Sequence, residues 1–204
     1  MRRNALVHLK VPHSLGVVQI ATATPSDALW IEHLQRKFNN DLGFVPRAGI
    51  RGLLDRRNYL RIDLDGKDAG FVLVTGGITK PVRISQIAID EQLWRNGIGA
   101  IAIALIRKKA LLMRKPDVVA TTREGLIANI VAIETGATHL ATTLHPSARK
   151  KRSHLYLWSH SCVEKPTQEG DNSGAIGTVD TYLRKGIAAT GRRKENRMAA
   201  SRSH

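Results

Sequence analysis

The segment from Ile84 to Ala104 most constrains how this chain can fold. Its first half carries β-branched residues and neither glycine nor proline, which predicts a strand. From Ile98 onward, apolar residues recur at i, i+3, i+4 and i+7, which predicts a helix. Between the two lies a short polar turn with Gly97 and Gly99 where the helix begins. The chain must therefore place a strand, a glycine turn and a helix N-terminus in direct succession.

This succession is suited to holding an anion. The first N–H groups of a helix have no acceptor within the helix, and the aligned peptide dipoles make that end partly positive. Glycine removes the Cβ atoms that would keep an anion at a distance. Arg95 adds a positive charge beside the turn. The segment is therefore a candidate cradle for a pyrophosphate group.

Other interpretations of the glycine turn remain open at this point. It can be an ordinary strand-to-helix turn that uses glycine for its backbone freedom, because short glycine motifs produce many false matches. A dinucleotide-binding turn fits poorly, since the three-glycine spacing and a clean βαβ repeat are missing. A nucleotide P-loop fits worse, because neither Gly-Lys-Ser nor Gly-Lys-Thr follows.

Two motifs resemble the GCN5-related N-acetyltransferase family. The run Trp94–Gly99 is similar to the family's Gln/Arg-x-x-Gly-x-Gly/Ala loop, which also lies between a strand and a helix, although Trp94 stands where Gln or Arg is usual. Downstream, Asn129 followed by Gly136 is similar to the family's Asn-containing helix, with Ala137 in place of a phenylalanine. The resemblance extends more loosely from Val17 to Trp158, and the order of the elements supports it better than either motif alone.

The resemblance implies acetyl-CoA as co-substrate, an amine as acceptor and no metal. The strand backbone would pair with the pantetheine amides, and the turn amides would hold the pyrophosphate. Asn129 would sit near the pantetheine or the leaving sulfur. The implied cofactor-binding residues are Ile87, Ala88, Ile89, Arg95, Asn96, Gly97, Ile98, Gly99, Ala100 and Asn129.

The catalytic groups are less clearly indicated than the binding groups. A lysine amine with a pKa of ~10.4 needs help to lose its proton. Of the acidic residues near the predicted strand ends, Glu91 is the first candidate for the base, and a solvated first-turn carboxylate is the alternative interpretation. Asn129 is the second candidate catalytic residue. The family often has an aromatic residue, sometimes a proton-donating tyrosine, where this chain has Ala132, so water would protonate the thiolate.

The remaining patterns predict an α/β fold. We expect a mixed, mostly antiparallel central sheet flanked by about four helices, as the resemblance also implies. The Asp65-Gly66 pair predicts a hairpin turn between two of the strands. The expected strands are 17–21, 59–64, 69–75, 82–89, 117–122, 139–144 and 154–158, and the expected helices are 28–39, 48–56, 97–114 and 125–135.

A length of 204 residues and a hydrophobic content of 42% suit one domain with tails. We expect an N-terminal arm over residues 1–16, an acetyltransferase-like domain over 17–160 and a basic, flexible tail over 161–204. No apolar run approaches the ~20 residues of a membrane span, and no secretory signal is evident. The only cysteine, Cys162, is expected in the tail and fits a reducing cytoplasm.

The net charge of +15 favours an acidic partner. A solvated basic surface is the plainer interpretation. The charge also supports an alternative function, a catalytically weak or inactive member of the same fold that contacts nucleic acid or an acidic partner. Its contacts would come from the tail and from a basic run in a predicted loop, which consists of Arg149, Lys150, Lys151 and Arg152.

Overall fold

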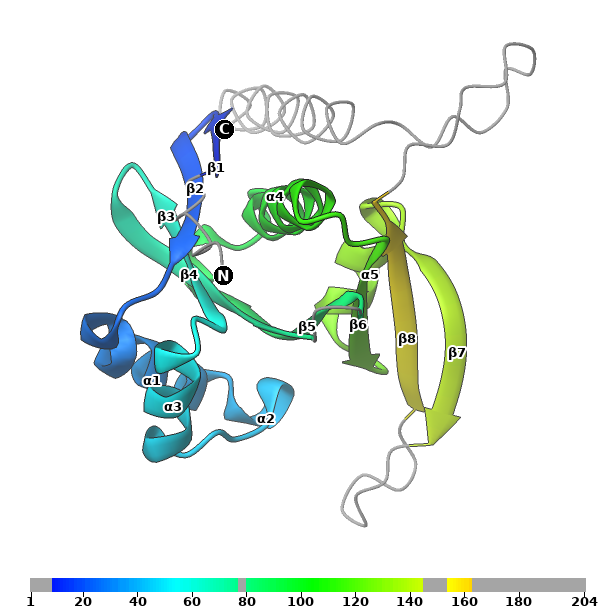
Figure 1. Cartoon of the computed structure of the whole chain (residues 1–204), viewed down its shortest axis with the longest axis horizontal. Helices are drawn as coiled ribbons and strands as arrows, with labels where there is room; N and C mark the ends of the chain where they lie inside the picture. Colours follow the sequence, from blue (N-terminus) through cyan, green and yellow to red (C-terminus); the bar gives the residue numbers. More distant parts are fainter. Residues whose placement is uncertain (1–8, 77–79, 145–153, 163–204) are drawn as a thin grey trace, which may run out of the picture.

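The computed structural model describes residues 9–76, 80–144 and 154–162 and shows one central sheet with helices on both faces (Figure 1). The α-helices are α1 (Ala28–Lys37), α2 (Asn39–Leu42), α3 (Arg47–Asp55), α4 (Ile98–Leu112) and α5 (Ile127–Glu134). The strands are β1 (Leu9–His13), β2 (Gly16–Thr22), β3 (Tyr59–Leu64), β4 (Lys67–Thr75), β5 (Val82–Ile89), β6 (Asp117–Arg123), β7 (Thr138–Leu144) and β8 (His154–Ser161). Short 3-10 turns lie at Pro25–Asp27 and Glu91–Leu93.

The eight strands are ordered β1-β2-β3-β4-β5-β6-β8-β7. Every neighbouring pair is antiparallel except β5 and β6, which are parallel. This is the mixed, mostly antiparallel sheet that the sequence predicts, and the fold class is confirmed. The helix and strand bounds differ from the predicted ones mainly at their ends, by one to three residues.

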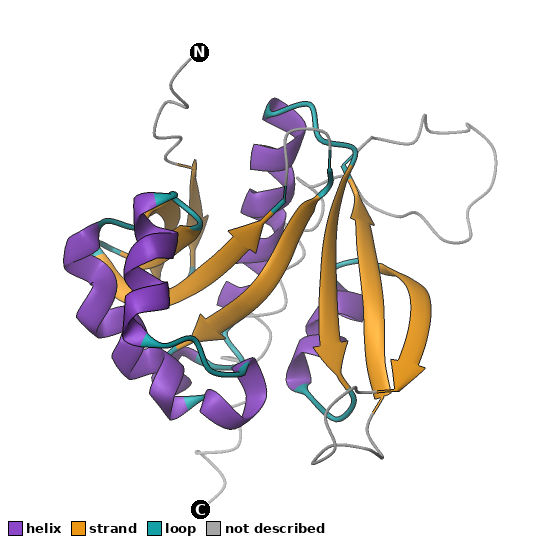
Figure 2. Ribbon diagram, turned by 60° about the horizontal axis from the view of Figure 1, so that its bottom comes forward, coloured by secondary structure: helices purple, strands orange, loops and turns teal. Residues whose placement is uncertain are grey.

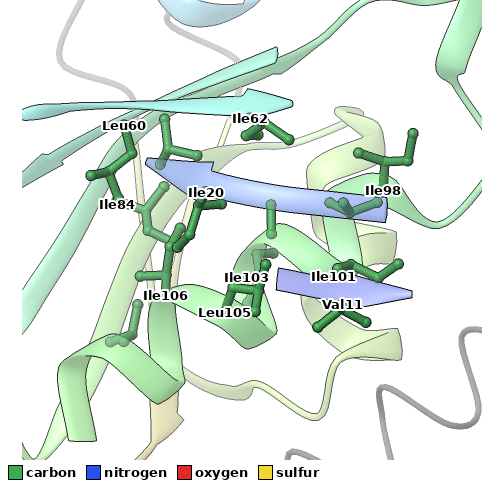
Figure 3. Packing of buried hydrophobic residues seen from close by; sticks show 14 of the residues in the cluster. Val11, Ile20, Leu60, Ile62, Ile84, Ile98, Ile101, Ile103, Leu105 and Ile106 are labelled. Atoms are coloured by element: carbon green, nitrogen blue, oxygen red, sulfur yellow. The ribbon is translucent and has the colours of Figure 1, made fainter. Parts of the chain in front are cut away.

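Helix α4 fills the first of two hydrophobic layers. Its buried side chains extend around most of its circumference, which is typical of a helix enclosed on several sides. They pack against β1 to β6, and Figure 3 shows Ile101 and Ile106 of α4 directed at the strand side chains. The layer therefore fixes the start of α4 relative to the sheet.

Helices α1 and α3 cover the other face of the sheet (Figure 1). Ile31 and Leu34 of α1 lie in one cluster with Tyr59 and Phe71 of the sheet, whose rings meet edge to face at 5.5 Å. The predicted helices over 28–39 and 48–56 are both present here. The α1–α3 layer forms the second wall around the middle of the sheet.

Residues 9–13 were expected in an N-terminal arm, but they form the edge strand β1. Its pairing with β2 runs from Leu9 opposite Ile20 to His13 opposite Gly16. Pro12 weakens the strand pattern in the sequence, yet an edge strand tolerates proline because one side of it makes no ladder hydrogen bonds. The sheet therefore begins before residue 17.

The sheet also continues beyond residue 160. Strand β8 ends at Ser161, and Cys162 is only 5% exposed. The Cys162 N–H donates a 2.9 Å hydrogen bond to the Pro116 carbonyl. Cys162 therefore belongs to the core around α4, and the expectation that it lies in the tail was wrong.

The parallel strands β5 and β6 pair over only three positions. The pairs run from Val82 opposite Val118 to Ile84 opposite Ala120. Beyond them the two strands diverge, as Figure 2 shows. Ser85 is an extra residue on β5 where the β4 register shifts, so this bulge coincides with the point of divergence. Both strands have unpaired backbone edges beyond it.

Candidate functional site

The turn after β5 is held by its tryptophan. The Trp94 indole Nε1–H donates a 2.7 Å hydrogen bond to the Ile89 carbonyl. The ring also stacks on Phe38 at a centroid distance of 5.5 Å. Trp94, which replaces the family's usual Gln or Arg, therefore fastens the turn to the end of β5 and to α1.

Two residues give the turn its backbone shape. Arg95 and Gly97 adopt positive φ angles of 63° and 78°. Gly97 is the N-cap of α4, and a Cβ placed on it would meet nothing within 4 Å, so glycine is favoured there by its backbone angle and not by lack of space. A Cβ on Gly99 would lie 3.9 Å from Ile89 Cγ1, an ordinary contact.

A histidine that the sequence analysis did not identify also supports this turn. His13 Nε2–H donates to the Asn96 carbonyl at 2.8 Å, and His13 Nδ1 accepts from the Leu15 N–H at 3.1 Å. These two partners define the Nε2–H tautomer. Only the pairing of β1 with β2 brings His13 to residue 96, so no local pattern could have indicated it.

The start of α4 leaves backbone donors unpaired. The first hydrogen bond across this helix start runs from the Ile101 N–H to the Gly97 carbonyl at 3.0 Å. Within the described ranges, no acceptor contacts the N–H groups of residues 95–100. Unpaired donors at the positive end of a helix provide the electrostatic conditions for binding an anion.

The free edge of β5 leads away from this helix start. The Asp90 N–H donates to the Ala69 carbonyl at 2.9 Å, so Gly70 and Ile89 form a non-hydrogen-bonded pair. Ile89 and Ile87 consequently direct their backbone groups away from β4, toward the diverging β6, while Ala88 faces β4. Of the three predicted pantetheine-binding residues, two have backbone groups on the free edge, and the Ile89 carbonyl is already occupied by Trp94.

Asn129 is fully hydrogen-bonded inside the protein. Its Nδ2 donates to the carbonyls of Arg123 at 2.8 Å and Leu126 at 3.2 Å. Its Oδ1 accepts from Trp158 Nε1–H at 3.1 Å and from the Thr122 hydroxyl. The side chain therefore holds the turn between β6 and α5. Ala132, one turn further along α5, is buried.

Glu91, the candidate base, and the two other acidic residues near the strand ends, Asp90 and Glu124, all make polar contacts at the surface. Glu91 lies in the 3-10 turn, is 49% exposed at its side chain and forms an ion pair with Lys37 at 3.1 Å. The Asp90 carboxylate accepts from the Gln92 N–H at 3.1 Å. Hydrogen bonds from the His154 side chain and backbone lower the pKa of Glu124. None of the three is enclosed by apolar side chains.

Helix α2 and its following loop form a wall beside the diverging strands. The Gln86 amide of β5 donates to the carbonyls of Leu42 at 3.0 Å and Gly43 at 3.3 Å. Arg123, at the end of β6, donates to the Asn40 carbonyl at 3.1 Å and to Asp41 at 3.0 Å. Both strands are therefore tied to α2. Phe44, which follows Gly43 in this loop, is 67% exposed and does not belong to the core.

A cavity of about 250 Å³ lies where β5 and β6 begin to diverge. Its polar lining consists of one guanidinium and three hydroxyl groups, and the lining residues are Thr75, Arg83, Ile84, Ser85 and Thr121. The Arg83 side chain donates to the Thr121 hydroxyl at 3.1 Å, and the hydroxyls of Thr75 and Ser85 lie 2.9 Å apart. The sequence analysis did not single out any of these hydroxyl groups.

The basic residues differ in whether the structure describes them and in whether they are accessible. Arg107 is buried in α4 and donates to the carbonyls of Thr135 at 3.4 Å and Ser161 at 2.9 Å, so it is not available to a phosphate. The run from Arg149 to Arg152 and the tail from residue 163 lie outside the described residues.

The described residues contain no cluster of three or more metal-ligating side chains. In the same part of the chain, no helix is long and apolar enough to cross a bilayer.

The chain shares its fold with solved structures of acetyltransferases. RimJ from Mycobacterium smegmatis, in complex with CoA-disulfide, aligns with a TM-score of 0.64 at 15% identity over 87% of this chain and 93% of that one. A GNAT-family acetyltransferase from Streptococcus pneumoniae aligns with a TM-score of 0.59 at 19% identity, over 71% and 98%. N-acetylglutamate synthase from Neisseria gonorrhoeae, complexed with coenzyme A and N-acetyl-glutamate, aligns with a TM-score of 0.56 at 20% identity, over 70% and 35%.

No family model and no curated protein matches the sequence. The structural matches nevertheless define the class of fold. The chain has the fold of the GCN5-related N-acetyltransferases, and the resemblance found in the sequence is confirmed at that level. At these identities the likeness extends to the architecture and not to the activity.

Proposed function

We propose that the protein transfers an acetyl group from acetyl-CoA to an amine. The observation that carries this proposal is the presence of two nearby sets of unpaired backbone groups, the N–H groups at the start of α4 and those on the free edge of β5, where the Ile89 carbonyl alone is occupied. The N–H groups of residues 95–100 would hold the pyrophosphate, and Ile87 and Ile89 would pair with the pantetheine arm. Similar solved structures contain coenzyme A or CoA-disulfide, which agrees with this co-substrate.

The order of these two sets of groups sets the direction of the bound arm. A strand rises by about 3.3 Å per residue, so Ser85 lies about 13 Å from Ile89 along β5. An extended pantetheine arm that starts at the turn would reach the bulge at Ser85 with its thioester. The reacting carbon would then lie where β5 and β6 diverge, next to the α2 wall.

The reaction is a direct transfer in this geometry. The amine nitrogen attacks the thioester carbon, the carbon–sulfur bond breaks, and sulfur leaves with the electron pair. Glu91 stands at the pyrophosphate end of the strand, so we assign removal of the amine proton and protonation of the thiolate to water. Asn129 acts as a positioning residue that keeps the β6–α5 turn in place.

Calorimetric titration with acetyl-CoA tests the proposal. Saturable binding is expected. Acetyl-CoA at a hundredfold excess over its Kd should also raise the free energy of unfolding by about 2.7 kcal/mol. Gly99→Asp places a carboxylate beside the pyrophosphate and should abolish binding. Gly52→Asp on α3, where a Cβ meets nothing within 4 Å, is the matched control and should bind normally. Absence of wild-type binding at millimolar acetyl-CoA would refute the proposal.

A thiol-release screen over amines then tests the transfer itself. Binding without turnover on any amine would favour the alternative, an inactive binding protein of this fold. We place the protein in the cytoplasm as part of the same proposal, because it has a single cysteine and CoA substrates are intracellular.

A further inference from the structure

The cavity between β5 and β6 indicates what the acceptor carries. If the proposed function is right, the amine approaches the thioester beside Ser85, which is one of the residues that line this cavity. The rest of the acceptor must then occupy space adjoining Ser85. The chemistry of the cavity wall therefore bears directly on the class of acceptor.

The cavity opens on the face that carries α2. Ile84 and Ala120 pack toward α4, so their neighbours Arg83 and Thr121 direct their side chains to the other face. Arg123, two residues after Thr121, contacts α2 from this face. The guanidinium and the hydroxyls therefore lie on the side from which an acceptor can enter, opposite the α4 layer.

Arg83 has no anionic partner within the described part of the chain. Its donors make one hydrogen bond there, from Nη2 to the Thr121 hydroxyl at 3.1 Å, and no carboxylate lies within 4.0 Å. Of the undescribed stretches, 1–8, 77–79 and 145–153 contain no Asp or Glu, and the acidic residues outside the described part all lie in 163–204. Arg36, Arg47, Arg61 and Arg123 form ion pairs, whereas Arg51, Arg56, Arg57, Arg95 and Arg114, like Arg83, form none within the described part of the chain. Arg83 differs from these unpaired arginines in lining the cavity.

We infer that the cavity binds a carboxylate of the acceptor, so that the substrate is an amine that also carries a carboxylate. The planar guanidinium suits bidentate hydrogen bonding to a carboxylate, and the Thr121 hydroxyl holds it in place. The hydroxyls of Thr75 and Ser85 add neutral donors beside it. Acceptors of this class are amino acids and peptides with a carboxylate near the amine.

Matched acceptor pairs test the inference. In each pair one carboxylate is replaced by its carboxamide: glycine and glycinamide, β-alanine and β-alaninamide, and the C-terminal amides of Ala-Glu and Ala-Gln, assayed with acetyl-CoA and the full chain. The wild type should prefer at least one carboxylate member by about tenfold to hundredfold in kcat/KM, as expected for a charge-assisted pair. The pair that shows the largest preference distinguishes a free amino acid from a peptide.

Arg83→Gln should raise the KM of the preferred carboxylate acceptor, leave its carboxamide partner nearly unchanged, and leave acetyl-CoA binding unchanged. Lys67→Gln, which removes one exposed charge from the β3–β4 hairpin, should keep the preference. Equal use of the two members of every pair by the wild type would overturn the inference and leave the acetyltransferase proposal standing. Equal loss on both members in Arg83→Gln would also overturn it.

A second readout does not depend on catalysis. The Arg83 side-chain Nε–H signal is followed by NMR while β-alanine or β-alaninamide is added. The carboxylate should shift this signal, the carboxamide should not, and Thr121→Val should weaken the effect. If acetyl-CoA fails to bind, this titration still decides whether the cavity takes a carboxylate. No shift with β-alanine, glycine or Ala-Glu would contradict the inference.

Discussion

Two buried polar side chains, Tyr59 and His160, each carry an atom without a hydrogen-bond partner in the described ranges. Tyr59 and His160 are 0% and 2% exposed. The atoms without a partner are the Tyr59 hydroxyl oxygen and His160 Nδ1. A buried polar atom without a partner costs roughly 1–3 kcal/mol. Both residues therefore lend themselves to direct tests of the core.

Tyr59→Phe should stabilise the protein. Burial raises the pKa of Tyr59 to about 12, which reflects the poor solvation of its hydroxyl. Phenylalanine keeps the edge-to-face contact with Phe71 and removes the unpaired hydroxyl, so the free energy of unfolding should rise by about 1 kcal/mol. Urea denaturation measures it. A loss of stability would mean that the hydroxyl has a partner in solution.

The burial of His160 leads us to predict that the folded protein loses stability in acid. Burial, aided by the charge of Arg107, lowers the pKa of His160 from 6.5 to about 4. Between these values the unfolded chain binds a proton that the folded protein does not, so stability is full above pH 6.5 and declines as the pH falls to 4. The loss amounts to about 3 kcal/mol. His160→Gln should flatten the wild-type slope over this range, and an unchanged slope would assign the loss to other groups.

The element that organises the molecule is the strand–turn–helix from β5 to α4. Local signals were sufficient to predict it, because a β-branched strand, a glycine N-cap and an apolar helix each follow from neighbouring residues. The divergence of β5 from β6, the support of Asn96 by His13 and the contact of Arg123 with α2 were not predicted. Each depends on the register of strands distant in sequence, which no local periodicity contains.

Asn129 illustrates the same limit at the turn between β6 and α5. The sequence resemblance places it near the leaving sulfur, and this role remains untested. Its hydrogen bonds predict a structural effect: Asn129→Ala leaves Trp158 Nε1 without one of its acceptors and frees two carbonyls, which should cost about 2 kcal/mol of stability. Thermal unfolding measures it. Unchanged stability together with reduced kcat would instead favour direct catalysis.

On the scale of the whole molecule, the charge of +15 is the property that acetyl transfer to a small amine does not explain. Nucleic-acid binding through residues 149–152 predicts DNA retention that weakens steeply with salt. Changing all four basic residues to Gln should reduce the slope of log K against log salt by about 3 to 4. Changing Lys10, Arg56, Arg57 and Lys67 to Gln removes the same charge elsewhere and is the matched control. Equal effects of the two sets would indicate only a general electrostatic attraction.

The most direct test of the central claim is an NMR titration of the full chain with coenzyme A, in which the backbone amides of Ile98, Gly99 and Ala100 are followed. We predict saturable shifts of these amides together with that of Ile87, as expected when the pyrophosphate lies at the start of α4 and the pantetheine arm lies along the free edge of β5. Binding of coenzyme A that leaves these amide signals unchanged, or no binding at all, would contradict the account.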